Sequence, residues 1–104
     1  MLTFEQKRAI FNSFPLTEYT THNGDRMNFK YKGKVVVSGL MHTGNGYIWG
    51  KDINGYTDTY QVDDRGWINF KEFSEDRIRT LLTDVLRYRD KLVKQIQTDD
   101  NNRL

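Results

Sequence analysis

Turn signals that contain glycine recur through the middle of the sequence, at the intervals of about 8–12 residues that are typical of an antiparallel meander. They lie at residues 23–24, 32–33, 44–46, 54–55 and 65–66. The Asn-Gly pairs among them favour type I′ turns, because both central residues of such a turn need positive φ angles. Tight turns join antiparallel strands, whereas parallel strands need long crossover connections. The sequence therefore predicts an antiparallel sheet.

The segments between these turns are rich in β-branched and aromatic residues, which favour strands. We expect strands at residues 17–21, 27–31, 35–41, 47–51, 56–62 and 67–70. The spacing of the turns thus predicts five or six strands in one sheet.

One helix is predicted before the meander in the sequence and another after it. Thr3 and Gln6 form a capping-box pattern, and Pro15 ends the first helix, which we expect at residues 4–14. Ser74 is a predicted N-cap for a second helix that continues to Gln97. Its apolar residues recur every three or four positions: Ile78, Leu81, Leu82, Val85, Leu92, Val93 and Ile96.

The predicted architecture is α+β: an N-terminal helix, a five- or six-stranded antiparallel meander sheet, and a long C-terminal helix packed on the sheet. We expect a single domain at residues 1–97, followed by a polar, disordered tail at residues 98–104. A chain of 104 residues is long enough to build one core without disulfides or metals.

Composition narrows the class of protein only a little. The formal net charge of +2 neither demands nor excludes a nucleic-acid partner. The absence of cysteine excludes disulfides and thiolate ligands. Residues 1–8 lack the apolar run of a signal peptide, and no stretch approaches the roughly 20 apolar residues of a membrane span. We therefore expect a cytoplasmic protein with no membrane partner.

Turn geometry allows the side chains of the sheet to be assigned to faces, with Phe29 opposite Val36, Trp49 opposite Tyr60 and Tyr47 opposite Val62. One face then collects Phe29, Tyr31, Val36, Leu40, Tyr47, Trp49, Tyr60 and Val62. The other collects Val35, Val37, Met41 and Ile48. A sheet solvated on one side should alternate cleanly. Because this one does not, either the sheet is curled around a well-filled core or part of a face meets a partner.

Candidates for chemistry are few. The histidines His22 and His42 lie at turns and lack the spacing of metal ligands. The acids could supply an acid–base pair only if two of them faced each other across a cleft: Asp52, Asp58, Asp63, Asp64 and Glu72. Asp63 and Asp64 are better explained by a tight turn. We therefore expect no enzyme activity, no metal and no cofactor, although a small enzyme whose site is not visible as a motif stays an alternative.

Aromatic and basic residues of the sheet form the candidate binding face, since single-strand nucleic-acid binders place lysines beside stacking aromatics. Its members are Tyr31, Lys34, Tyr47, Trp49, Lys51 and Tyr60. The competing interpretation is that the aromatics belong to the core and that the lysines protect sheet edges.

A resemblance points in the same direction. The hairpin at residues 32–35 and the passage from strand to helix at residues 68–82 are similar to a family of single-stranded-DNA-binding proteins in which an antiparallel meander precedes a helix. The resemblance covers about half of the chain without a diagnostic motif. The N-terminal helix and the additional strands depart from it, so membership does not follow.

The long helix suggests a partner. Its predicted length exceeds that of the strands it must cover, and its apolar stripe continues past them at Leu92, Val93 and Ile96. These residues are candidate dimer contacts, and packing of the first helix on them is the alternative. The sequence thus favours a non-enzymatic interaction or regulatory protein that acts through protein–protein contact, as a homodimer or with another protein. Single-stranded nucleic-acid binding is the first alternative to this interpretation, and a small enzyme is the next.

Overall fold

A computed structural model of the chain describes residues 1–51, 53 and 59–102, with the backbone alone for His22 and residues 95–102. The elements in order are α1 (Phe4–Asn12), β1 (Thr17–Thr21), a 3-10 turn η1 (His22–Gly24), β2 (Arg26–Tyr31), β3 (Lys34–Leu40), β4 (Tyr47–Trp49), β5 (Trp67–Asn69) and α2 (Glu75–Asn102). The strands form one five-stranded sheet in sequence order, and every neighbouring pair is antiparallel. The predicted α+β architecture is confirmed.

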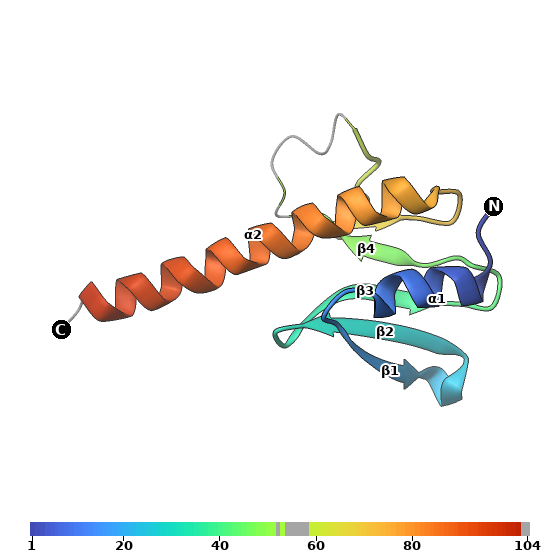
Figure 1. Cartoon of the computed structure of the whole chain (residues 1–104), viewed down its shortest axis with the longest axis horizontal. Coiled ribbons are helices and arrows are strands. Elements are labelled where there is room, and N and C mark those ends of the chain that lie inside the picture. Colours follow the sequence, from blue (N-terminus) through green and yellow to red (C-terminus); the bar gives the residue numbers. More distant parts are fainter. Residues whose placement is uncertain (52, 54–58, 103–104) are drawn as a thin grey trace.

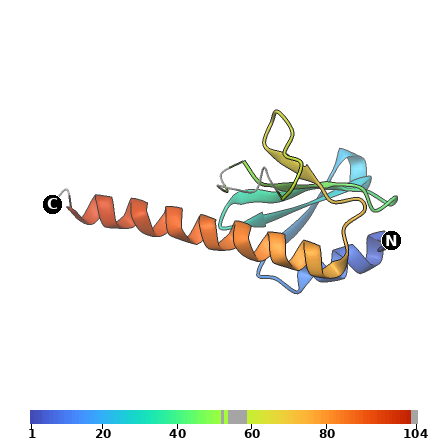
Figure 2. The same cartoon turned by 90° about the horizontal axis from the view of Figure 1, so that it is seen from above.

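Both helices lie on the same face of the sheet, as Figures 1 and 2 show. The predicted caps explain where they begin. Thr3 and Gln6 form a complete capping box, and Ser74 Oγ accepts a hydrogen bond from the backbone N–H of Arg77. The buried core fills the space between helices and sheet: Ile10, Phe11, Phe29, Tyr31, Val36, Val37, Leu40, Ile48, Tyr60, Ile68, Phe70, Ile78, Leu81, Leu82, Val85 and Leu86.

The prediction of a strand at residues 56–62 fails where the structure describes it. Residues 59–61 form no strand, and Val62 makes an isolated bridge with Ile68. The partner of β4 is therefore β5, in which Trp67 faces Trp49 and Asn69 faces Tyr47. The predicted pairs of Trp49 with Tyr60 and of Tyr47 with Val62 are wrong. The predicted turn at 54–55 lies outside the described residues.

A β-bulge in β3 overturns the predicted assignment of faces. The register shifts between Lys30 and Phe29, so that Phe29 faces Val37 and not Val36. A bulge places two successive residues against one on the partner strand, and here Val36 and Val37 are both buried. Sequence alternation cannot show an inserted residue, because the period of two assumes an unbroken ladder.

The helices cover one face of the sheet, and a row of paired apolar residues marks that face. Across the strands β2 to β5 the row consists of Phe29, Val37, Ile48 and Ile68. Tyr47 pairs with Ser38 and Asn69 on the opposite face. The bulge explains the mixed pattern in the sequence, because it lets Val36 and Val37 both be buried, while Val35 pairs with Lys30 and is half-buried.

Lys7 is a buried lysine that joins three distant parts of the chain. It is fully buried on α1, and its Nζ donates hydrogen bonds of 2.7 Å to the carbonyl oxygens of Gly44 and Lys71. Its Nζ also lies 5.4 Å from the centroid of the Phe70 ring. Gly44 has φ +84°, and a Cβ there would lie 3.2 Å from the lysine nitrogen. Glycine thus permits both the turn and the close approach of the amine.

α2 is much longer than the sheet it covers. Its 28 residues span about 42 Å at 1.5 Å per residue, whereas the seven residues of β3 span about 23 Å. The C-terminal part of α2 consequently extends beyond the sheet (Figures 1 and 2). The helix continues to Asn102, past the predicted end at Gln97; disorder of residues 98–104 stays a prediction. No helix among the described residues is long and apolar enough to cross a membrane.

Replacing Lys7 with methionine should destabilise the fold. The Lys7→Met variant keeps the length of the side chain but leaves the buried carbonyl of Gly44 without its donor, which should cost about 1–3 kcal/mol. Urea unfolding measures the loss, and Glu5→Gln on the exposed side of α1 is the control, expected within about 0.5 kcal/mol of wild type. Equal stability of Lys7→Met and wild type would contradict this role.

The same lysine should make stability depend on pH. Burial, and secondarily the charge of Lys71, lower the pKa of Lys7 below its usual 10.5. Between the lowered pKa and 10.5 the unfolded chain binds more protons at Lys7 than the folded chain, so folding gains free energy as pH rises through that window. The stability advantage of wild type over Lys7→Met should therefore grow as the pH rises through the lowered pKa of Lys7 towards its usual 10.5. An advantage that shrinks as pH rises would refute this assignment.

Candidate functional site

The six residues of the predicted binding face do not lie together. Tyr31 and Tyr60 are core residues, with 8% and 6% of their surface exposed. Lys34 and Trp49 lie next to α2, and the Lys34 Nζ is 4.0 Å from the centroid of the Trp49 ring. Tyr47 is 38% exposed on the face opposite the helices, and Lys51 is exposed beyond the end of β4. The structure therefore does not assemble a single stacking platform from these six side chains.

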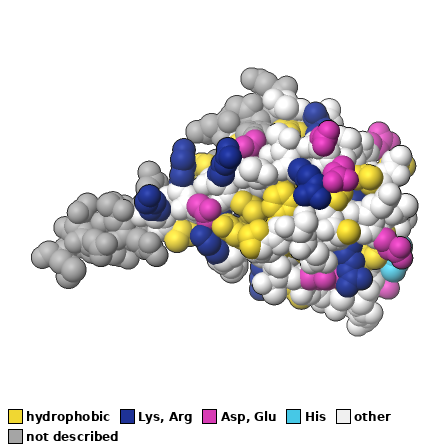
Figure 3. Space-filling model, in the orientation of Figure 1, with side chains coloured by type: hydrophobic (Ala, Val, Ile, Leu, Met, Phe, Trp, Pro, Cys, Tyr) yellow, Lys and Arg dark blue, Asp and Glu magenta, His cyan; other side chains and the backbone are white. Residues whose placement is uncertain are grey.

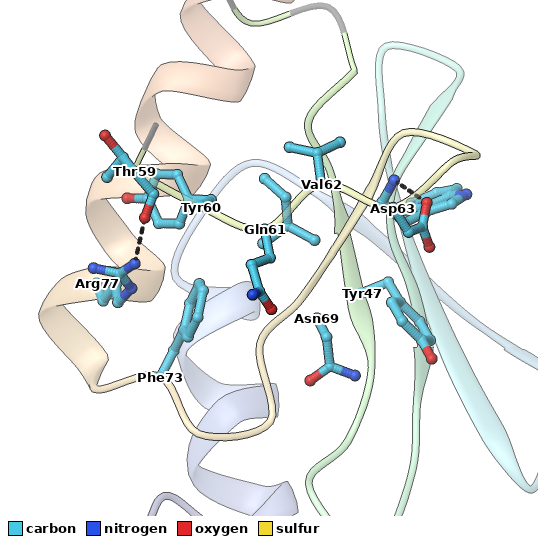
Figure 4. Close-up of a pocket in the computed structure, with 11 residues that line it drawn as sticks. Tyr47, Thr59, Tyr60, Gln61, Val62, Asp63, Asn69, Phe73 and Arg77 are labelled. Carbon is cyan, nitrogen blue, oxygen red and sulfur yellow. Dashed lines mark hydrogen bonds between the residues drawn. The ribbon is translucent and has the colours of Figure 1, made fainter. Parts of the chain in front are cut away.

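A large hollow lies at the β5 edge, between the segment 59–63 and the beginning of α2 (Figure 4). Its volume is about 770 Å³, and Gln61 points between Phe73 and Asn69. Arg77 closes one end: its guanidinium stacks 4.5 Å from the centroid of Tyr60 and donates a hydrogen bond of 2.8 Å to the carbonyl oxygen of Thr59.

Two polar side chains of this hollow, Asp63 and Asn69, are engaged within the chain. Asp63 Oδ1 accepts hydrogen bonds from the backbone N–H groups of Arg65 and Trp67, as expected of an acid in a tight turn. The Asn69 amide donates to Asn45 Oδ1 and accepts from the N–H of Lys71. Ligand sites usually offer converging polar groups, whereas these groups hold turns and the segment 59–63 in place.

The candidates for catalysis are dispersed. His42 is exposed, with its ring 5.4 Å from that of Phe4, while the side chain of His22 lies outside the description. Asp64 and Glu72 are exposed, and Asp52 and Asp58 are not among the described residues. Within the described part of the chain, no three His, Cys, Asp or Glu residues are grouped as metal ligands would be.

A narrow crevice lies where α2 leaves the sheet. Its volume is only about 20 Å³, and both the sheet side and the helix supply apolar side chains and one cation. Its lining comprises Lys34, Val36, Trp49 and Ile53 from the sheet side, and Val85, Tyr88, Arg89 and Leu92 from α2. Of the predicted dimer contacts, Leu92 is half-buried and lines this crevice, and Val93 is half-buried but does not line it. The side chain of Ile96 lies outside the description.

Arg89, which lines the crevice, differs from the other lining residues in its hydrogen bonding. Its Nε is buried and has no hydrogen-bond partner among the described residues. A buried donor without an acceptor costs about 1–3 kcal/mol. Tyr88 and Arg89 were not among the predicted contacts, although both lie about one helical turn before Leu92 on α2.

A polar network fixes α2 at the border of the crevice. Asp90 Oδ1 accepts hydrogen bonds from the Tyr31 hydroxyl at 2.8 Å and from Lys32 Nζ at 2.6 Å. Hydrogen bonds from Lys32 and then Tyr31 hold the pKa of Asp90 below its usual value, and the Asp90 carboxylate raises the pKa of Tyr31. α2 is thus attached to the β2–β3 hairpin at Asp90, immediately before it leaves the domain.

Comparisons with protein-family models, with curated proteins and with solved structures find no match to this chain. The site is therefore judged on its geometry. The crevice beside the extending helix combines an apolar lining with two cationic side chains, Lys34 and Arg89.

Two tyrosines of the predicted binding face should respond differently to truncation. Tyr60→Ala should cost about 3 kcal/mol or more in unfolding free energy, because the ring is buried against Phe73 and Arg77. Tyr47→Ala should cost less than about 1 kcal/mol, because Tyr47 is exposed. Denaturant unfolding of both variants measures the difference. Similar losses would contradict the separation of these residues between core and open face.

Proposed function

We propose that the chain is a non-enzymatic binding module that acts through protein–protein contact at the extending part of α2. The observation that carries the proposal is the helix that continues past the sheet, with Leu92 half-buried in the crevice and Val93, the next residue of α2, half-buried as well. An isolated helical segment of this length is marginal in water, because most helical stability comes from packing. A polypeptide packed along α2 would supply that stability.

The chemistry of the surface supports the same proposal. Charged residues surround the apolar lining of the crevice, and Figure 3 shows Lys and Arg side chains gathered where the described part of α2 leaves the body of the molecule. An apolar centre with a polar, charged rim is the usual anatomy of a protein–protein interface. Arginine and tyrosine, here Arg89 and Tyr88, are enriched at the energetic centres of such interfaces.

Single-stranded nucleic-acid binding on the open face is the second candidate. Lys30 Nζ lies 5.0 Å from the centroid of the Tyr19 ring, and Tyr47 is exposed on the same face. Asp63 and Asp64 adjoin Tyr47 in a hollow of about 450 Å³. Because carboxylates repel phosphates, this arrangement supports the second candidate less well than the crevice supports the first.

Photo-cross-linking in cells that express the chain distinguishes the two proposals. A photoreactive phenylalanine analogue is placed at Val93 in one variant and at Tyr47 in another, as a matched control on the open face. Protein contact along α2 should give a protein adduct from position 93 and none from position 47. The size of that adduct then reveals whether the partner is a second copy or a different protein.

Two results would overturn the proposal. A nucleic-acid adduct at position 47, with no adduct at position 93, would move the function to the open face. The lack of any adduct at either position, in variants whose unfolding curves match wild type, would reject protein contact at this part of α2.

A further inference from the structure

A hollow on the sheet face opposite the helices brings two aromatic rings and two carboxylates together. Its volume is about 450 Å³, and it lies beside the turn that the hydrogen bond from Gly66 N–H to the Asp63 carbonyl closes. The structure describes every side chain of its lining, which comprises Ser38, Tyr47, Asp63, Asp64, Arg65 and Trp67. Apolar and acidic side chains thus border the same space.

Backbone pairing and side-chain contacts hold this lining in place. Tyr47 lies on β4, which is paired with β3 on one side and with β5 on the other. The Trp67 ring packs edge-on against that of Trp49, with 4.9 Å between the centroids. Asp63 Oδ1 accepts hydrogen bonds from the backbone N–H groups of Arg65 and Trp67. A ligand therefore does not have to order these groups, which favours binding.

The charges around the hollow favour a cation. Asp63 and Asp64 stand against Arg65, which is the only basic residue of the lining. Lys51 packs against Gly66 of the same turn but does not line the hollow. The faces of tyrosine and tryptophan rings are negative as well, because of the quadrupole of their π electrons. Rings and carboxylates therefore attract positive charge at the same place.

The two rings of the lining differ from their neighbour in their contacts with cations. Trp49, which packs against Trp67, has Lys34 Nζ 4.0 Å from the centroid of its ring. Among the described residues, no lysine or arginine lies over the ring of Tyr47 or Trp67 in this way. These two rings can therefore receive a cation from outside the chain.

We propose that this hollow binds a small molecule that carries an alkylated ammonium group, of the kind found in choline. Such a group is both cationic and apolar, so it suits a space bordered by rings and carboxylates. An unmodified ammonium is more strongly hydrated and gains less from the rings. The hollow shares no lining residue with the crevice at α2, so this site does not depend on the proposed function.

Choline and its neutral carbon analogue, in which a tert-butyl group replaces the trimethylammonium group, test the need for charge. Choline chloride replaces sodium chloride in an NMR titration, so that ionic strength stays constant. The indole N–H signal of Trp67 should shift with a Kd in the millimolar range, as expected for so small a ligand. The neutral analogue should bind at least about three-fold more weakly. The absence of a shift with choline, or equal Kd values for the two compounds, would overturn the proposal.

Substitutions in the lining test the place of binding. Asp64→Asn should weaken choline binding by roughly two- to five-fold, because one of the attracting charges is lost. Tyr47→Leu keeps an apolar side chain without the ring, and should weaken binding by about three-fold or more. The matched control is Glu5→Gln, which removes the same charge from α1 on the other face of the sheet and should stay within about two-fold of wild type. Equal effects of Asp64→Asn and Glu5→Gln would overturn the site.

A short peptide that contains trimethyllysine tests whether the ammonium group belongs to a small molecule. It should bind no more tightly than choline, because the hollow receives only the trimethylammonium group. Much tighter binding of the peptide would overturn the assignment to a small molecule and would assign the group to a modified protein.

Discussion

The positions of α1, the β3–β4 connection and the β5–α2 connection relative to one another depend on the hydrogen bonds of the Lys7 ammonium group. It donates to Gly44 in the β3–β4 connection and to Lys71 in the β5–α2 connection, so that α1 is fastened to both from inside the protein. A lysine is rarely buried without an acidic partner, and two backbone carbonyls with one aromatic ring replace that partner here. The beginning of α2, and therefore the direction in which α2 leaves the sheet, is determined beside this contact.

Local sequence signals predicted the elements of the fold well. The strand at Thr17–Thr21, the capping box at Thr3 and the N-cap at Ser74 all follow from short-range rules, and the structure confirms them. What failed depended on the register. The bulge that buries both Val36 and Val37 is a three-dimensional adjustment of the ladder. The segment before β5 has strand-like composition, but its described part makes a single bridge, through Val62, because β5 already occupies the edge of β4.

The candidate site was predictable only in part. The apolar stripe at Leu92 and Val93 was visible in the sequence, since helical spacing is a local property. The crevice was not, because it depends on where the end of β4 places Trp49 relative to α2. The predicted aromatic face failed to assemble for the same reason: Tyr31 and Tyr60 look like surface aromatics until the packing of α2 is known. Which residues of different strands and helices meet can be predicted only when the strand register is known. At β3 the register expected from the sequence was wrong, because of the bulge.

The sequential order of the strands has a consequence for how the chain reaches this structure. Each strand pairs with the next one along the chain, so the sheet forms through local contacts with small loop-closure entropy. The hydrogen bonds of Lys7 span 37 and 64 residues, so each can form only after its own acceptor has been synthesised. A growing chain that ends before residue 71 therefore leaves the Lys7 amine without one of its two carbonyl acceptors.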